Sequence, residues 1–277
     1  MTATLTIDER NDRLPSVFGV RMSRGALELK QMVRQRDAVI FTFLFPLVLM
    51  VSFSAIFQST IPGTDIDFRQ YFIAGMIATG IMAATFVNVG IGIALERDDG
   101  TLKRLRGTPM RLSSYFIGKA VMVLAVTAVQ VALLLLIGTL LFGLNLPTTP
   151  QRWLTLAWLL VLGVIACTLL GIAVSAVPRG GRSAATVVVL PFMVLQFISG
   201  VFFVSTQMPP AVQTAGALFP LKWLGQGLGS VFLPDTLQRV EPAGGWEHGT
   251  IALVLIAWIV GALIVSVATF RWHRARV

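Results

Sequence analysis

The sequence has little charge and almost no cysteine. Asp, Glu, Lys and Arg make up 13% of its 277 residues, against about 25% in a soluble domain, and hydrophobic residues make up 55%. Cys167 is the single cysteine, which excludes a disulfide or a thiolate metal site within one chain. The mean hydropathy of +0.80 is typical of an integral membrane protein.

Six long stretches lack charge, and each is close to the ~20 apolar residues that a spanning helix needs. We therefore expect an all-α integral membrane protein with a cytoplasmic N-terminal segment, 1–37, and a six-helix transmembrane domain, 38–277. The expected spans cover residues 38–57, 71–95, 115–144, 153–177, 184–204 and 250–270. The polar first fifteen residues do not fit a removable signal peptide.

The net charge of +9 is distributed unevenly between the two sides of the predicted spans. Eighteen of the 22 Lys and Arg residues fall before span one, after spans two and four, and after span six. The positive-inside rule predicts that these residues and both termini are cytoplasmic, in a plasma (bacterial inner) membrane. Topology and contact with anionic membrane lipid therefore account for the positive charge, and we expect no nucleic-acid partner.

Before span one, Met22, Ala26, Leu29 and Val33 recur at helical spacing, with basic residues mostly opposite them. This pattern predicts an amphipathic helix lying on the inner membrane surface. The alternative is a solvated tail. Between spans five and six, prolines open two short apolar helices within residues 209–232, which we expect to be re-entrant or interfacial on the outer side.

Apart from Lys119, the predicted spans carry no acid or base. Ion-driven carriers usually need such groups, and no Walker A motif occurs, so energy for uphill transport must come from another subunit. Asn88, Gln130 and Gln196 are the strongest hydrogen-bonding side chains within the spans. They either hold helices together or line a substrate pathway.

Charge is dense in the segment "LERDDGTLKRLRGTP", residues 95–109, after span two. Glu96 opposes the dipole at the end of span two, which predicts a cationic partner. Asp98 and Asp99 are predicted to cap a short helix, 98–106, that Gly107 ends in the left-handed conformation. Leu102 and Leu105 lie one turn apart on this helix.

Three interpretations of this segment compete. A simple positive-inside anchor needs no acidic cluster and no capping residues. A Mg²⁺ site for an enzyme needs several carboxylates, yet after Gly100 the next acid is Asp235, on the opposite side. We therefore expect neither a metal site nor a catalytic site in this chain. The third interpretation is a docking helix through which a cytoplasmic ATPase moves spans two and three.

The segment "ERDDGTLKRLRGTPM" resembles the E-R-x-x-G-T-L-x-x-L-x-x-T-P motif of type-2 ATP-binding-cassette (ABC) permeases, which include multidrug and drug-resistance exporters. The stretch "SGVFFVSTQMPPAVQTAGALFPLKWLGQGL" resembles the same family's S-G-x-x-F-P-x-x-x-M-P-x-x-x-Q stretch. Lys103, where an acid is frequent, and Val204, where proline is frequent, depart from these patterns. The matching residues are Glu96, Gly100, Thr101, Leu102, Leu105, Thr108 and Pro109 in the coupling segment, and Gly200, Phe203, Met208, Pro209 and Gln213 in the outer one.

The resemblance implies an interfacial helix, six spans, a cytoplasmic coupling helix and short outer helices. It implies a second permease half, in a homodimer or heterodimer, and two copies of an ATP-binding subunit that hold ATP and Mg²⁺. This chain itself is then expected to bind no cofactor. The resulting hypothesis is an exporter of a drug, antibiotic or lipid-like compound. The alternatives are an ABC exporter of a lipid-linked glycan, a nucleotide-independent channel and an ion-driven carrier.

Overall fold

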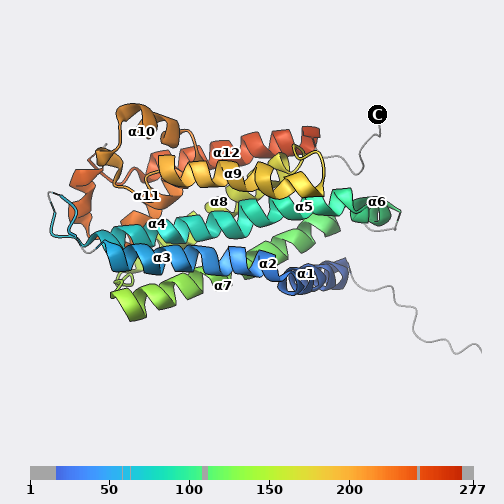
Figure 1. The fold of residues 1–277 in the computed structure, drawn as a ribbon, viewed down its shortest axis with the longest axis horizontal. Helices are drawn as coiled ribbons and strands as arrows, with labels where there is room; N and C mark the ends of the chain where they lie inside the picture. The colour runs from blue at the N-terminus through green and yellow to red at the C-terminus, as the bar shows by residue number, and fades with distance from the viewer. Residues whose placement is uncertain (1–16, 58, 63, 108–111, 242–243, 270–277) are drawn as a thin grey trace, which may run out of the picture.

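The computed structural model describes residues 17–57, 59–62, 64–107, 112–241 and 244–269 (Figure 1). Within these residues the chain is helical apart from short connections and one isolated bridge between Thr60 and Asp67, as expected for an all-α protein. The α-helices are α1 Val17–Arg34, α2 Arg36–Val39, α3 Phe45–Ile56, α4 Phe68–Met82, α5 Asn88–Asp98, α6 Thr101–Arg106, α7 Leu112–Phe142, α8 Pro150–Val174, α9 Gly181–Ile198, α10 Pro210–Ala217, α11 Pro220–Phe232 and α12 His248–Thr269.

Two π-helical segments join α-helices that the sequence placed within one span. Ile40–Leu44 connects α2 to α3, and Ala83–Val87 connects α4 to α5 without a break. A π-helical turn is rare and often accompanies a functional position or a helix bend. Pro46, which the sequence placed inside span one, lies in the first turn of α3, directly after the first of these segments. Its missing backbone donor therefore lies where the α-helical hydrogen-bond pattern of the continuous helix Ile40–Ile56 is already interrupted by the π-helical turn.

Five helices are long and apolar enough to cross a membrane, and they correspond to expected spans two to six. Their ranges are Phe68–Asp98, Ser114–Phe142, Pro150–Val174, Gly181–Ile198 and His248–Thr269. Expected span one forms a shorter apolar helix, Ile40–Ile56, so its crossing stays a prediction. The predicted end of span five at residue 204 is wrong, because the helix stops at Ile198 and Gly200 then adopts a positive φ of 72°.

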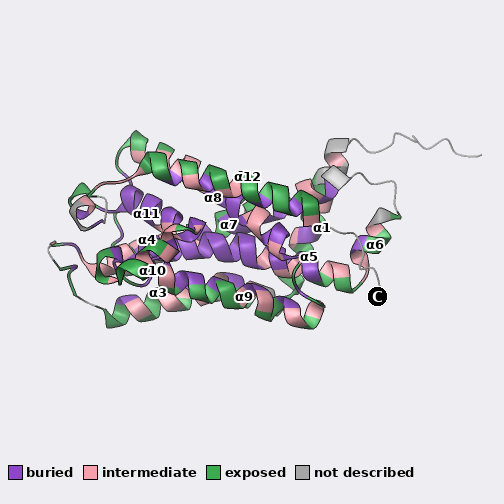
Figure 2. Cartoon of the chain, turned by 90° about the horizontal axis from the view of Figure 1, so that it is seen from above, coloured by how far each residue is buried: buried purple, intermediate pink, exposed green. Residues whose placement is uncertain are grey.

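Span two, formed by α4 and α5, lies in the middle of the molecule. In its apolar window 94% of the residues are buried, and Figure 2 shows this buried run between the other helices. Helices α3, α7 and α11 pack against α4, while α8 and α9 pack against α5. Any displacement of span two must therefore be accommodated by most of the fold, since packed interiors leave few voids.

The N-terminal helix α1 packs along α7 through small residues. A Cβ added to Gly25 would lie 2.7 Å from Val121 Cγ1, so the two helices approach very closely. The buried face of α1 is made by Gly25, Glu28 and Met32. The apolar stripe that the sequence assigned to the membrane surface lies outside this packed face, since Met22 and Val33 are 41% and 62% exposed, and its contact with the membrane stays a prediction. This stripe remains open at the surface of the chain.

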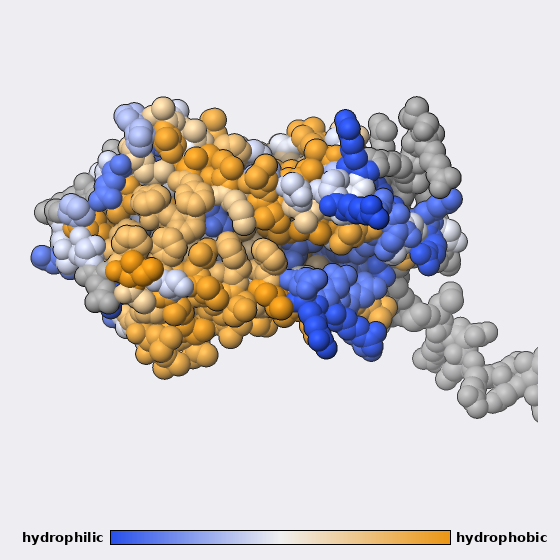
Figure 3. Space-filling model, viewed as in Figure 1, coloured by the Kyte–Doolittle hydropathy of each residue, from blue (hydrophilic) through white to orange (hydrophobic). Residues whose placement is uncertain are grey.

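The two ends of the molecule differ in polarity. Helices α1 and α6 lie near one end with the last turn of α12, and α10 and α11 lie at the other (Figure 1). Figure 3 shows an apolar surface between the two ends and a hydrophilic region around α1 and α6. We call these the α6 end and the α11 end. Most of the predicted cytoplasmic basic residues belong to segments at the α6 end.

Gly171 provides a test of the packing between spans two and four. A Cβ at this position would lie 2.8 Å from the Phe86 carbonyl oxygen, whereas a Cβ at Gly261 of α12 would meet no atom within 4 Å. We expect Gly171→Val to lower the unfolding free energy by about 1–3 kcal/mol through overpacking. Thermal unfolding of the detergent-solubilised chain measures this loss. An equal loss in Gly261→Val would contradict the close packing.

Candidate functional site

The charged segment after span two forms a sharp reversal followed by a short helix. Helix α5 continues through Asp98, and Gly100 adopts a left-handed φ of 78° before α6 begins at Thr101. The predicted helix start at residue 98 is therefore too early. The predicted left-handed conformation at Gly107 is also wrong, because its φ is −76°. The sharp change of direction comes before α6, and it requires the glycine there.

Asp98 and Asp99 act as caps of two different helices. The Asp99 Oδ1 atom accepts a hydrogen bond from the backbone N–H of Thr101 at 2.8 Å. The Asp98 Oδ2 atom accepts one from the N–H of Gly181, the first residue of α9, also at 2.8 Å. A carboxylate at a helix N-terminus is favoured by the helix dipole. Among the residues that the structure describes, no group of three or more His, Cys, Asp or Glu side chains could hold a metal ion.

Glu96 has the cationic partner that its position predicted. Lys119 Nζ of α7 lies 2.5 Å from Glu96 Oε1 and 2.6 Å from Glu28 Oε2 of α1. Tyr115 donates a hydrogen bond to Glu96 Oε2 at 2.7 Å, and the Arg24 guanidinium lies 2.6 Å from Glu28 Oε1. We call these five residues the ion cluster. It ties the end of span two to both α1 and α7.

The ion cluster is almost completely shielded from solvent. The side chains of Lys119 and Glu28 are only 5% and 3% exposed, and that of Glu96 is 14% exposed. Desolvation makes a buried charge costly unless it is paired. Here the two carboxylates face two cations, so the formal charges balance. The arrangement therefore holds three helices in one register while no cluster charge is left uncompensated.

Arg97 links the same segment to a further helix. Its guanidinium donates hydrogen bonds to the carbonyl oxygens of Ser175, at 2.6 Å, and Pro178, at 3.3 Å. Ser175 follows the end of α8, where the helix dipole favours a cation. Residues 96–98 thus contact α7, the residues that follow α8, and α9, and they are linked to α1 through Lys119. The reversal that leads into α6 is therefore fixed to several other parts of the fold.

Helix α6 presents an apolar side to the protein and a basic side outward. Leu102 is fully buried in the main core, and Leu105 is packed against that core. Lys103 and Arg104 are exposed. This division fits an element that is seated on the helix bundle and accessible to another protein. The predicted coupling residues Thr108 and Pro109 lie outside the described residues.

The three polar candidates for a substrate pathway lie within or between helices. Asn88 Oδ1 accepts a hydrogen bond from Thr42 at 3.0 Å, which joins the Ile40–Leu44 segment to span two. Gln130 and Gln196 are 0% and 2% exposed. Thr42 supports a helix-joining role for Asn88, and substrate contact by the three residues stays a prediction.

The outer motif forms a turn and a helix start at the α11 end. The Gly200 carbonyl accepts a hydrogen bond from the Tyr71 hydroxyl at 2.8 Å. Gln213 Nε2 donates to the Met208 carbonyl at 2.8 Å and fastens α10, whose N-terminus Pro209 caps. Phe203 is 47% exposed. The two short helices predicted for residues 209–232 are thus present, as α10 and α11, and their location on the outer side stays a prediction.

Residues 25–233, which contain α6 and both outer helices, match the family model described as ABC-2 type transporter. The chain belongs to this family. This ABC-2 permease is also 22% identical, over 253 residues, to the Bacillus subtilis (strain 168) protein named "Putative transport permease YvfS". That similarity covers 90% of this chain and 96% of the relative. The permease is thus a multi-pass membrane subunit of an ABC transporter, whose family implies an ATP-binding partner.

Sequence reasoning predicted a partner for Glu96 in this ABC-2 permease but not the residues that supply the network. Arg24, Glu28 and Tyr115 come from segments far from Glu96 in the sequence. Two signals were present: Lys119 is the one charge inside a predicted span, and Glu28 is an acid within a basic helix. Neither signal shows which charged side chains contact one another in the folded protein.

The ion cluster predicts non-additive mutant effects. Lys119→Met leaves two buried carboxylates facing Arg24 alone, and we expect it to cost about 3–5 kcal/mol of stability. Adding Glu96→Gln restores the charge balance and should recover part of this loss. Thermal unfolding, together with protease cleavage between α1 and α2, measures both effects. Lys103→Met, on the exposed side of α6, is the control. Strictly additive losses of unfolding free energy in the Lys119→Met, Glu96→Gln and double variants would contradict a shared cluster.

Proposed function

We propose that this chain is the permease half of an ABC exporter that moves a hydrophobic or amphipathic compound out of the cell. Separate ATP-hydrolysing subunits, which bind ATP and Mg²⁺, dock on α6 from the cytoplasm. The observation that carries the proposal is the attachment of α6 to span two through Gly100, directly beside residues that are bonded to α7, to the end of α8 and to α9, and through Lys119 to α1. A displacement of α6 would therefore move span two and the helices that are bonded to it.

The exposed basic residues of α6 define the chemistry expected of the ATPase surface. Lys103 and Arg104 are exposed while Leu102 is buried, so the helix offers cations to its partner. Opposite charge across an interface guides association and fixes register. The groove of the ATPase subunit that receives α6 should accordingly be acidic. Two ATPase copies would meet two permease halves, as a homodimer or a heterodimer.

An apolar cavity supports the proposed class of cargo. It has a volume of about 640 Å³ and lies between α7, α8 and α12, in the half of the molecule nearer the α6 end. Drug-sized ligands occupy pockets of roughly 300–1,000 Å³ that are lined mostly by apolar side chains. Polar side chains in the lining come from Lys119, Thr168 and Ser266. The cavity suits a hydrophobic compound better than a hydrophilic polymer.

Reversing the charge of α6 tests the docking surface. We expect Lys103→Glu combined with Arg104→Glu to reduce co-purification of the ATPase subunit by at least tenfold and to abolish ATP-dependent export. Both side chains are exposed, so insertion into the membrane should not change, and loss of the exposed hydrogen bond from Arg104 to the Asp99 carbonyl oxygen, at 3.2 Å, should alter thermal stability little. Arg182→Glu, an exposed cation at the start of α9, is the matched control. Normal binding and export by the double variant would rule out this surface.

Gly100 tests the connection between α6 and span two. Proline requires φ near −65°, whereas Gly100 has φ 78°, so Gly100→Pro must misdirect α6. We expect nucleotide hydrolysis to continue in the complex while export falls at least tenfold. Gly107→Ala is the control, because φ −76° suits alanine. Transport by the purified chain without nucleotide would instead favour a passive channel.

A further inference from the structure

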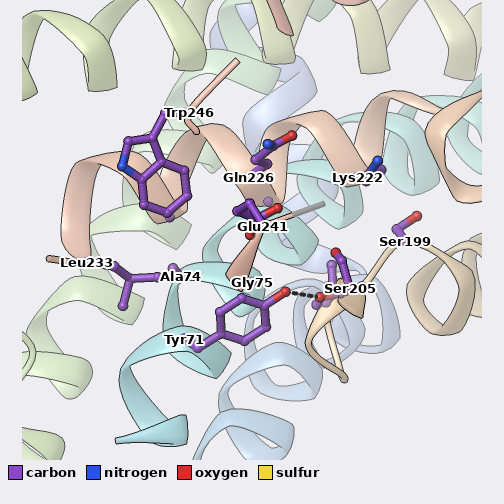
Figure 4. Close-up of a pocket in the computed structure, with 14 residues that line it drawn as sticks. Tyr71, Ala74, Gly75, Ser199, Ser205, Lys222, Gln226, Leu233, Glu241 and Trp246 are labelled. Carbon is purple, nitrogen blue, oxygen red and sulfur yellow. Dashed lines mark hydrogen bonds between the residues drawn. The ribbon is translucent and has the colours of Figure 1, made fainter. Parts of the chain in front are cut away.

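A small polar cavity lies at the α11 end, away from α6 and the ion cluster. It is enclosed by the start of α4, the turn after α9, helix α11 and the segment that follows α11 (Figure 4). Its volume of about 20 Å³ is enough for about one water molecule. We call residues 233–241 the outer strap; its two ends, Leu233 and Glu241, line the cavity.

Several buried polar atoms around the cavity have no partner in the described residues. They are Gln226 Oε1 of α11, Ser199 Oγ of the turn after α9, and Trp246 Nε1. The residues Gln226 and Ser199 are 8% and 4% exposed. Unpaired buried donors and acceptors cost free energy, and a bound water with two to four partners would remove this cost. The cavity therefore has the size and the chemistry of a water site.

Glu241, at the end of the outer strap, points into this cavity in Figure 4. It is 6% exposed, and no described cation lies within ion-pair distance of it. The titratable groups that face it are Lys222 of α11, Tyr71 of α4 and Glu247 before α12. Arg239 precedes it by two residues on the strap itself. The carboxyl group is thus buried beside one cation and one further acid.

We propose that Glu241 and this cavity form a proton-binding latch. Protonated Glu241 holds the end of the outer strap on α4 and α11. Ionisation of Glu241 draws water into the cavity and releases this end of the strap. The rest of the strap has independent anchors. Leu233 and Leu237 are 0% and 1% exposed in a small apolar cluster with Ile61 and Val204. Ionisation therefore loosens the end that carries Glu241 and leaves these anchors in place.

The direction of the pH effect follows from the environment of Glu241. Burial raises the pKa of its carboxyl from 4.5 to about 7; Lys222 lowers this pKa, and Glu247 raises it further. A group with a raised pKa in the closed form favours closure at low pH. This advantage declines as pH rises from 4.5 to about 7 and is absent above that range. Each unit of pKa difference corresponds to about a tenfold change in the closing equilibrium.

The latch deepens the proposed function, because an outer segment of the exporter would become sensitive to external pH. This link between the latch and export rests on the proposed function. Its structural basis does not require export. Hydrogen exchange of the strap amides can therefore test it in the full chain in lipid nanodiscs, without nucleotide or cargo. A failed export assay leaves this measurement unaffected, so the two proposals can fail separately.

We expect amides 238–241 to lose at least tenfold of their protection between pH 5.5 and pH 8, after correction for intrinsic exchange rates. Glu241→Gln, which mimics the protonated acid, should be protected equally at both values. Leu237, inside the apolar anchor, should change little in either protein. Equal protection of the wild-type amides at both pH values would overturn the latch.

His248 is a second ionisable side chain near this cavity, so the assignment to Glu241 needs a control variant at this position. Its Nε2 atom lies 2.9 Å from Ser230 Oγ of α11, close to the same region. His248→Asn should keep the full pH dependence if Glu241 is responsible. A pH dependence that survives Glu241→Gln, or disappears in His248→Asn, would overturn the assignment to Glu241.

Discussion

The buried ammonium group of Lys119, placed between Glu28 and Glu96, is the contact on which the α6 end of the molecule depends. A charge in this position is expensive to desolvate, and a buried ion pair is often no more stable than apolar packing. Its structural effect is that removing any one charged partner leaves an unpaired buried charge, which destabilises the fold more than the complete set does. The cluster therefore specifies how α1, α7 and span two meet, and it opposes any arrangement that separates them.

This constraint explains why residues 95–109 combine both signs of charge. A positive-inside anchor would require only Lys and Arg, which hydrated headgroups satisfy at many depths. Glu96, Arg97 and Asp98 instead each contact a different set of helices. Asp99 then caps the short helix that leads outward. The segment is a rigid junction, and α6 is the part of it that another subunit can reach.

The fold was predictable where local chemistry decides it. Charge-free runs predicted spans two to six because bilayer thickness fixes helix length, and prolines at 210 and 220 predicted the starts of α10 and α11. Tertiary contacts decided the rest. Periodicity predicted an apolar stripe on α1 for the membrane surface, but it could not predict the face that packs on α7, which depends on the close approach at Gly25 and the pairing of Glu28. The helix dipole predicted that Glu96 needs a cation, but the identity of Lys119 depends on how α7 packs.

The two ends of this permease satisfy their buried polar groups in opposite ways. At the α6 end the cluster charges are balanced, so ionising or neutralising a single member is penalised and the junction resists small displacements. At the α11 end Glu241 is buried without a described ion pair, beside polar atoms that lack partners. Such groups are satisfied equally well by water, so opening there costs less. If ATPase subunits dock on α6 as proposed, force enters at the end whose buried charges are paired, and the latch proposed at Glu241 lies at the opposite end.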